Sequence, residues 1–132
     1  MCHVRELSTQ IAEVYKKITK FSDIEVSNYT TDGKADGCQV VVTTLGKLSN
    51  ALKGRRKALD LSELKAFVID ESDVFFNEER NLDNLKEVNT KYISKLPNKV
   101  QFIFFSATYT EDVKAAIAQF SEESNQINLR KE

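Results

Sequence analysis

The stretch that decides the fold runs from Ala66 to Asp73 and reads AFVIDESD. Its four apolar residues are too few for a helix and suit a buried strand, and the acids follow at the strand's carboxyl end. Open parallel α/β sheets bind their ligands at that end of the strands. A carboxylate buried there needs a cation, hydrogen bonds or a shifted pKa to offset its desolvation. We therefore predict a metal and nucleotide site at Asp70 and Glu71.

A second apolar strand, Phe102–Phe105, is followed by the small polar segment Ser106–Thr108. Its two hydroxyl groups can hydrogen-bond Asp73 or Asp70 and so join the two strand ends. The alternative is that these hydroxyls cap the next helix, a common role of Ser and Thr.

Two adjacent acids can divide the work of nucleotide hydrolysis. On an extended backbone the side chains of Asp70 and Glu71 point in different directions. One acid then holds Mg²⁺ through its water shell while the other addresses a nucleophilic water. One alternative is a surface turn whose acids cap Val74–Phe76. Another is a divalent ion bound for structural reasons alone.

The rest of the chain alternates between helical and strand patterns. We predict helices at residues 5–20, 45–53, 78–96 and 110–120, a helical turn at 61–64, a loop at 30–37 and a basic connector at 54–57. Strands are predicted at residues 24–29, 39–43, 65–70, 100–105 and 126–129. Because strands and helices alternate over connections of moderate length, we expect one α/β domain with a mainly parallel sheet and helices on both faces.

Composition narrows the function classes. The chain has 132 residues, 30% charged residues and a formal net charge of -1, which argues against an overall polybasic nucleic-acid binder. Its two cysteines, Cys2 and Cys38, lack metal-ligand spacing, so a disulfide framework or zinc site is not expected. No apolar stretch approaches the ~18 residues of a membrane helix. We expect a soluble intracellular protein, with the single histidine, His3, at a frayed terminus.

Local phosphate contacts remain compatible with that composition. Thr44, Gly46 and Lys47 open a helix after the Val40–Val42 strand, and a helix N-terminus offers unpaired N–H groups to an anion. Arg5 lies at the start of the first helix. Each of these residues also fits ordinary solvated surface charge.

Four segments follow one another in order: Val4–Gln10 (VRELSTQ), Val42–Leu48 (VTTLGKL), Val68–Asp73 (VIDESD) and Phe105–Thr108 (FSAT). They resemble the T-R-E-L-A-x-Q, T-P-G-R, D-E-A-D and S-A-T motifs of DEAD-box ATP-dependent RNA helicases. The tail after Phe120 most resembles the branch that works in mRNA export at the nuclear pore. The resemblance implies that residues 1–132 are a partial helicase ATP-binding domain, the first RecA-like domain, of the P-loop NTPase type.

The resemblance also implies catalytic and coupling roles. Asp70 would hold Mg²⁺ through water, and Glu71 would orient or deprotonate the attacking water. Asp73 would bond to Ser106 or Thr108, in the segment that couples the ATP state to RNA strand separation.

For RNA, the resemblance implies that Arg5, Thr44, Gly46 and Lys47 lie along the phosphate backbone. Such contacts are made to phosphate and ribose, so sequence-independent binding is implied. Lys47 stands where the family has Arg, which keeps a charge but loses the bidentate fork.

The chain departs from the family in one further respect. It contains no G-x-x-x-x-G-K-[ST] run and no glutamine motif that reads adenine. We therefore expect an N-terminally truncated domain that hydrolyses no ATP and binds no cofactor tightly, although the full-length protein would use Mg²⁺ with ATP. The alternative is a degenerate, non-catalytic module that binds RNA or protein.

The implied partners are RNA, a second RecA-like domain and an mRNA-export activator, with no membrane partner. The implied location is the cytoplasm or nucleus, including the nuclear pore.

Overall fold

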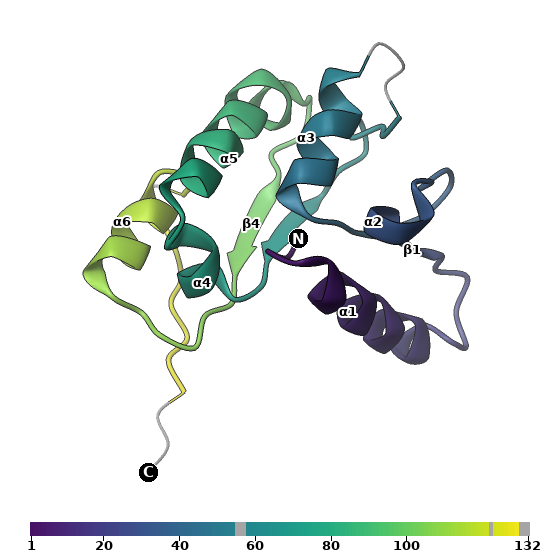
Figure 1. Ribbon diagram of the computed structural model, residues 1–132, viewed down its shortest axis with the longest axis horizontal. Coiled ribbons are helices and arrows are strands. Elements are labelled where there is room, and N and C mark those ends of the chain that lie inside the picture. Colours follow the sequence, from purple (N-terminus) through teal and green to yellow (C-terminus); the bar gives the residue numbers. More distant parts are fainter. Residues whose placement is uncertain (55–57, 122, 130–132) are drawn as a thin grey trace.

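Short parallel strands surrounded by helices form the framework of the protein (Figure 1). The computed structural model describes residues 1–54, 58–121 and 123–129, so the basic residues 55–57 of the expected connector lie outside the described part. Among the helices described, none is long and apolar enough to cross a membrane. The strands are β1 (Val26–Asn28), β2 (Val40–Val42), β3 (Ala66–Ile69) and β4 (Gln101–Phe104). The helices are α1 (Arg5–Ile18), α2 (Tyr29–Asp32), α3 (Leu45–Lys53), α4 (Ser72–Phe76), α5 (Glu79–Lys91), the 3₁₀ helix η1 (Ile93–Lys95) and α6 (Glu111–Ala118).

Residues Met1 and Cys2 join two parallel strand pairs, β1–β2 and β3–β4. The Met1 amino group donates to the Val68 carbonyl at 2.5 Å, and the Asp70 N–H donates to the Met1 carbonyl at 3.1 Å. On the other side, the Cys2 N–H donates to the Thr43 carbonyl at 3.1 Å, and Cys2 forms a parallel bridge with Thr44. This alternation of partners is that of a parallel strand, so Met1 and Cys2 lie between β2 and β3. The predicted parallel α/β architecture is confirmed. The prediction that His3 lies at a frayed terminus is wrong, because Met1 and Cys2 before it are paired on both sides.

Helices cover both faces of the β1–β2 pair. The Asn28 Nδ2 group donates to Thr9 Oγ1 at 3.3 Å, which places α1 over the face that carries Asn28 and, in the neighbouring strand, Val42. Val41 points the other way and packs against the main hydrophobic core, to which α3 contributes. Successive residues of a strand face opposite sides, so α1 and α3 lie on opposite faces of this part of the sheet.

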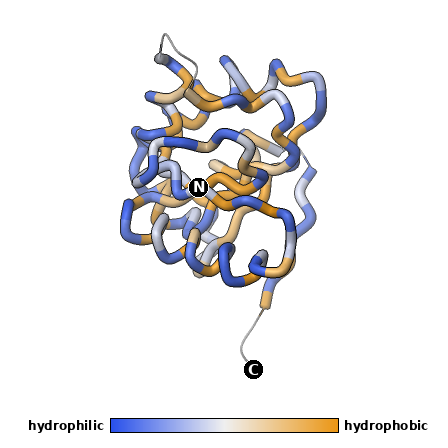
Figure 2. Tube along the Cα trace, turned by 90° about the vertical axis from the view of Figure 1, so that its right-hand side faces the viewer, coloured by the Kyte–Doolittle hydropathy of each residue, from blue (hydrophilic) through white to orange (hydrophobic). Residues whose placement is uncertain are grey.

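The main core lies on one face of β3 and β4. Phe67 and Ile69 of β3 are buried there, and Phe102 of β4 packs on Phe67 with ring centroids 5.5 Å apart. The helices supply further buried side chains to this core, among them Leu48, Phe75, Leu85 and Val88. Figure 2 shows these hydrophobic segments gathered at the centre of the molecule, with hydrophilic segments around them.

A surface ion-pair network links α3 to α5 at the edge of this core. Glu87 accepts from Lys53 at 2.7 Å and from Lys91 at 2.6 Å. These hydrogen bonds lower the pKa of the Glu87 carboxyl to about 2. Exposed pairs of this kind contribute little to stability, so the packed apolar faces hold the two helices together.

Three predicted elements differ in the structure. The predicted loop at residues 30–37 begins inside α2, which ends at Asp32 and is capped by Gly33 in a left-handed conformation (φ 64°). The predicted helix at residues 78–96 is divided at Tyr92 into α5 and a 3₁₀ turn. The predicted helical turn at residues 61–64 is a hydrogen-bonded turn outside any helix.

The predicted strand at residues 126–129 is wrong. In the described part of the tail no residue pairs with a strand, and Ile127 and Leu129 are 87% and 95% exposed. An extended segment forms a strand where a neighbour accepts and donates its backbone hydrogen bonds, and in the described structure residues 126–129 lie beside no strand that does so.

Candidate functional site

The acidic residues after β3 lie on the surface and not in a desolvated pocket. Asp70 is half-buried, and the Glu71 side chain is 48% exposed. The Glu71 N–H donates to Asp70 Oδ1 at 3.0 Å. Solvent therefore reaches both acids, and the burial cost that the sequence suggested is small.

Glu71 has a backbone conformation that the sequence analysis missed. Its φ of 49° and ψ of 51° lie in the left-handed region, so the prediction of an extended backbone at Glu71 is wrong. This turn immediately precedes α4, a helix that the sequence analysis did not predict. A non-glycine residue in this region is uncommon and costs energy, so the surrounding contacts must hold it.

Contacts of the next residue, Ser72, stabilise this backbone conformation. Its side chain is fully buried, its N–H donates to the Phe105 carbonyl at 2.8 Å, and its hydroxyl donates to the same carbonyl at 3.0 Å. The end of β3 is therefore joined to the end of β4. Ser72 stands where the D-E-A-D motif has Ala, and its hydroxyl adds a hydrogen bond that Ala cannot make.

Asp73 makes a second connection between these strand ends. Its Oδ2 atom accepts from the Thr108 hydroxyl at 2.6 Å and from the Thr108 N–H at 3.1 Å. These bonds, the Thr108 hydroxyl above all, lower the pKa of Asp73. The Ser106 hydroxyl donates to the Thr108 carbonyl and also helps to lower the pKa of Asp73. Thr110, not Ser106 or Thr108, caps α6, with the Val113 N–H 3.3 Å from its hydroxyl.

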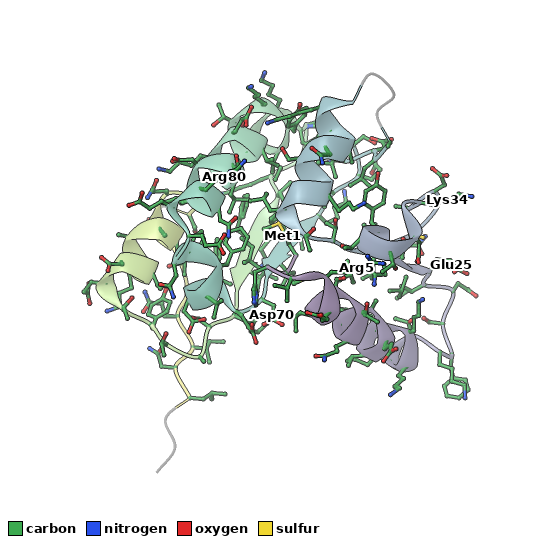
Figure 3. The ribbon with its side chains drawn as sticks, viewed as in Figure 1. Met1, Arg5, Glu25, Lys34, Asp70 and Arg80 are labelled. Atoms are coloured by element: carbon green, nitrogen blue, oxygen red, sulfur yellow. The ribbon has the colours of Figure 1, made fainter. Side chains whose placement is uncertain are left out.

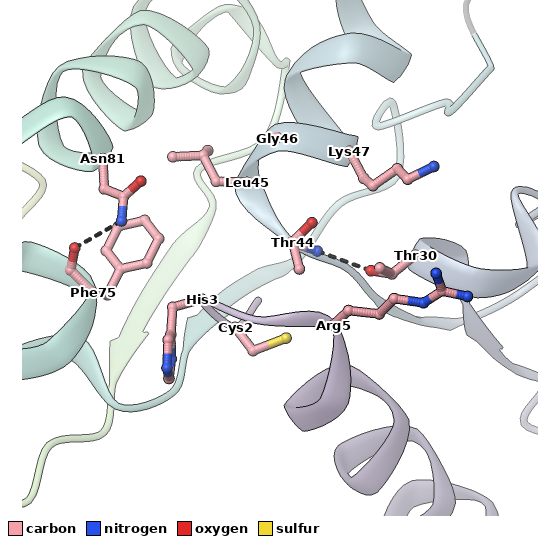
Figure 4. Close-up of a pocket in the computed structure, with 10 residues that line it drawn as sticks. All are labelled: Cys2, His3, Arg5, Thr30, Thr44, Leu45, Gly46, Lys47, Phe75 and Asn81. Atoms are coloured by element: carbon pink, nitrogen blue, oxygen red, sulfur yellow. Dashed lines mark hydrogen bonds between the residues drawn. The ribbon is translucent and has the colours of Figure 1, made fainter. Parts of the chain in front are cut away.

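The four residues proposed for phosphate contacts lie together. Arg5, Thr44, Gly46 and Lys47 line one pocket of about 400 Å³ between the start of α1 and the start of α3 (Figure 4). The Thr44 N–H donates to Thr30 Oγ1 at 3.1 Å, which holds the turn before α3 against α2.

The wall of this pocket formed by α3 offers backbone donors. The first three N–H groups of α3, at residues 45–47, precede the first intrahelical bond, from the Leu48 N–H to the Thr44 carbonyl at 3.0 Å. A Cβ atom at Gly46 would meet nothing within 4 Å, so this side of the helix start is open. Open N–H groups and the positive end of the helix dipole favour an anion.

His3 connects the pocket to the acids, and the sequence analysis missed it. It lines the pocket, and its Nδ1 atom lies 3.4 Å from Glu71 Oε2. Figure 3 shows Asp70 and Arg5 at the same end of the strands, close to Met1. No local sequence pattern marked it, because His3 gains this place from the pairing of the two residues before it between β2 and β3.

The acids alone do not form a complete metal site. Within the described ranges, no group of three or more His, Cys, Asp and Glu side chains is arranged to hold a metal ion. Mg²⁺ commonly takes one or two carboxylates and completes its shell with water and substrate phosphate. The accessible Asp70 carboxylate fits that kind of site.

Comparison with known proteins covers the residues of this site. Residues 1–116 match the family model described as DEAD/DEAH box helicase. The chain is 29% identical to the ATP-dependent RNA helicase dbp5 of Schizosaccharomyces pombe, over 97% of this chain and 25% of that protein. It is 32% identical to DBP5 of Candida albicans, over 97% of this chain and 23% of that protein. The chain therefore spans about a quarter of the length of these relatives.

Solved structures give the same result for the fold. Saccharomyces cerevisiae Dbp5 bound to RNA and ADP BeF3 superposes with a TM-score of 0.78 at 28% identity, covering 98% of this chain and 33% of that chain. A variant of the same protein bound to Nup159, Gle1, IP6 and ADP superposes with a TM-score of 0.74 at 29% identity, covering 94% of this chain and 33% of that chain.

Proposed function

Because the chain belongs to the DEAD/DEAH box helicase family, we propose that it carries the RNA-backbone pocket and the hydrolytic carboxylates of a Dbp5-like RNA helicase. These two parts belong to the first RecA-like domain in this proposal. Residues 1–132 then form part of that domain, and the protein that contains it couples ATP hydrolysis to remodelling of RNA duplexes.

The convergence of Arg5, Thr44, Gly46 and Lys47 on one pocket carries the proposal. These residues come from the start of α1, from the N-cap of α3 and from the first turn of α3, so only the fold brings them together. Two cationic side chains beside unpaired backbone N–H groups suit a phosphate group, and they do not distinguish one nucleobase from another. RNA binding at this pocket is therefore independent of sequence and weakens as salt rises.

The acids serve hydrolysis in this proposal. Asp70 would hold Mg²⁺ through water, and the ion would neutralise charge on the phosphates of ATP. Glu71 orients the attacking water or takes its proton, and its carboxylate lies 3.4 Å from the Nδ1 atom of His3, a residue that lines the pocket. Asp73 and Thr108 keep the ends of β3 and β4 in one arrangement, through which nucleotide and RNA states communicate.

By itself the 132-residue chain is proposed to hydrolyse no ATP. The sequence contains no P-loop motif, so no lysine and backbone cradle grips the β- and γ-phosphates. A phosphate-release assay with ATP, Mg²⁺ and RNA tests this directly. Phosphate release stimulated by RNA from the purified chain would overturn it.

Partners and location follow from the relatives alone. Dbp5 has been solved with Gle1 and with Nup159. We propose that the protein containing this chain uses a second RecA-like domain and an export activator, and works between nucleus and cytoplasm.

RNA binding tests the main proposal. Fluorescence anisotropy with labelled single-stranded oligo(U) and oligo(A) should give equal affinities for the two RNAs, falling steeply from 50 to 200 mM salt. The Arg5→Gln/Lys47→Gln double variant should bind at least tenfold more weakly, because it removes both cationic side chains from the pocket.

The control is the Lys16→Gln/Lys17→Gln variant at the other end of α1, which removes the same charge from exposed positions. It should retain most of the affinity. Equal losses in both double variants would show that binding depends on net charge alone, and no binding by the unchanged chain would reject the proposal.

A further inference from the structure

His3 is a pocket residue whose side chain also meets one of the acids. It lines the pocket together with Arg5 and Lys47, and its Nδ1 atom lies 3.4 Å from Glu71 Oε2. Among the other described residues that line the pocket, none forms an ion pair or a side-chain hydrogen bond with the side chain of Asp70 or Glu71. His3 therefore links the proposed phosphate site directly to the proposed hydrolytic site.

The backbone on both sides fixes the place of His3. The N–H of Cys2 before it donates to the Thr43 carbonyl at 3.1 Å, and Val4 after it is the N-cap of α1 in an extended conformation. The His3 side chain is 22% exposed, so most of the imidazole is packed. Figure 4 shows the ring pointing away from α3. The fold therefore holds the imidazole in one place, at the wall of the pocket.

The Nδ1 atom of His3 is buried and has no hydrogen-bond partner within the described structure. A buried polar atom without a partner is uncommon in folded proteins and costs free energy. The separation of 3.4 Å between Nδ1 and Glu71 Oε2 exceeds the ordinary length of an N–H···O hydrogen bond, which is about 2.9 to 3.0 Å. A small movement of the Glu71 side chain would close this gap and give Nδ1 an acceptor.

Glu71 can make that movement with its side chain while its backbone stays fixed. The backbone has a left-handed conformation that contacts of Ser72 stabilise, whereas the Glu71 side chain is 48% exposed. Catalytic hydrogen bonds commonly shorten when a substrate binds. A contact between a fixed imidazole and a movable carboxylate can shorten in this way.

We propose that His3 is a positioning residue for Glu71 and links RNA in the pocket to the carboxylate that acts on water. This inference rests on the proposed function, since it takes RNA as the ligand of the pocket and Glu71 as the residue that orients water. The neutral imidazole carries one proton, which stays on Nδ1, and Glu71 Oε2 accepts a hydrogen bond from it. Glu71 Oε1 then remains free to accept from water. RNA packed against the imidazole restricts its movement and, through this bond, the movement of the carboxylate.

The competing explanation is that His3 only fills space at the pocket wall. A packing role depends on the shape of the ring, whereas a positioning role depends on the Nδ1 proton. His3→Phe keeps a ring and removes the donor. His3→Asn removes the ring but places an amide N–H at the same number of bonds from Cα as Nδ1–H. The positioning role therefore predicts that the Asn variant resembles the unchanged chain more closely than the Phe variant does.

The position of the imidazole proton tests the contact without RNA. The chain has one histidine, so its imidazole signals need no assignment. Imidazole ¹⁵N NMR of the purified chain at about pH 8.5, where histidine is ordinarily neutral, should show the proton predominantly on Nδ1. Glu71→Ala removes the acceptor and should move the proton toward Nε2. Glu78→Ala, which removes an exposed acid before α5, is the control and should leave the proton on Nδ1.

The link to the pocket is tested with RNA bound. The ¹³C signal of the Glu71 carboxyl group should shift when saturating single-stranded oligo(U) is added to the unchanged chain. In His3→Phe this shift should fall at least threefold, and in His3→Asn most of it should return. Saturation with RNA keeps differences in affinity out of the comparison. The carboxyl group of Glu111, which is paired with Lys114 on α6, is the internal reference and should not shift.

A Glu71 signal that does not move when RNA binds, or that moves equally in the unchanged chain and in His3→Phe, would overturn this inference alone. An imidazole proton in the same position in the unchanged chain and in Glu71→Ala would overturn it as well. Should His3→Phe fail to fold, the spectra of Glu71→Ala still decide whether His3 and Glu71 are bonded. Failure of RNA to bind the unchanged chain would reject the proposed function, and the coupling with it.

Discussion

Two acids that lie two residues apart after β3, Glu71 and Asp73, have opposite surroundings. Asp73 accepts two hydrogen bonds from Thr108, a residue 35 positions away in the sequence. Glu71 is 48% exposed, and its carboxylate meets the His3 imidazole at 3.4 Å. The acid that joins two strand ends is thus held in place, while the acid proposed to act on water stays accessible.

The helix α4 produces this difference. Ser72 and Phe75 are fully buried on its inner side, while Val74 is 44% exposed. Phe75 belongs to the main hydrophobic core, and Phe76 packs against that core. The helix is therefore anchored to the core, and Asp73 is held toward Thr108 by that anchor. The difference between the two acids depends on packing beneath them.

Removing the buried ring of Phe75, which holds α4 on the core, should have the largest effect on stability. Phe75→Ala deletes a fully buried ring and should lower the free energy of unfolding by about 3 to 5 kcal/mol, measured by urea denaturation. Val74→Ala, in the same helix but half exposed, should cost less than about 1 kcal/mol. Equal losses in the two variants would mean that Phe75 does not anchor α4.

Removing the hydrogen bonds between Asp73 and Thr108 should have an intermediate effect on stability. Asp73→Asn weakens two bonds to Thr108 and should cost about 1 kcal/mol, since the carboxylate is partly solvated. In a double-mutant cycle, Asp73→Asn and Thr108→Val should cost clearly less together than the sum of their separate effects. Asp70→Asn keeps the acceptor for the Glu71 N–H and should change stability by under about 0.5 kcal/mol.

The same hydrogen bonds predict that the free energy of unfolding depends on pH. The pKa of Asp73 is lower in the folded chain than in the unfolded chain. Its stabilising contribution is therefore complete above the unfolded-state pKa and is lost as the pH falls through the lower, folded-state pKa. The stability difference between the unchanged chain and Asp73→Asn should shrink over that acid range in urea titrations. A difference that stays constant down to the lowest pH at which the chain folds would contradict this.

Relieving the backbone at Glu71 should have the smallest effect, and of opposite sign. Glycine adopts the left-handed conformation without a Cβ penalty, so Glu71→Gly should raise the free energy of unfolding by about 0.5 to 1 kcal/mol. Glu78→Gly is the matched control, because its φ of -96° is ordinary and glycine gains nothing there. A loss of stability in Glu71→Gly would mean that the side chain makes a stronger contact than the one with His3.

Much of the candidate site was predictable because its residues follow strands and begin helices. The apolar runs before Asp70 and before Ser106 predict two strands whose ends meet, and the start of a helix at Thr44 predicts open N–H groups. His3 was missed because its importance depends on Met1 and Cys2 pairing between β2 and β3. No local pattern in two residues can show that pairing.

By itself, the sequence determined the four strands and the helices α1, α3, α5 and α6 in their order, the acids and hydroxyls at the strand ends, and the family to which the four motifs belong. Local apolar periodicity and residue type carry that information, so no distant contact is needed. Tertiary structure alone decided that the Thr108 hydroxyl and N–H bond Asp73, that Glu71 has a left-handed backbone conformation, and that residues 126–129 form no strand. Each of these depends on hydrogen bonds to segments distant in the sequence, which exist only once the strands have paired.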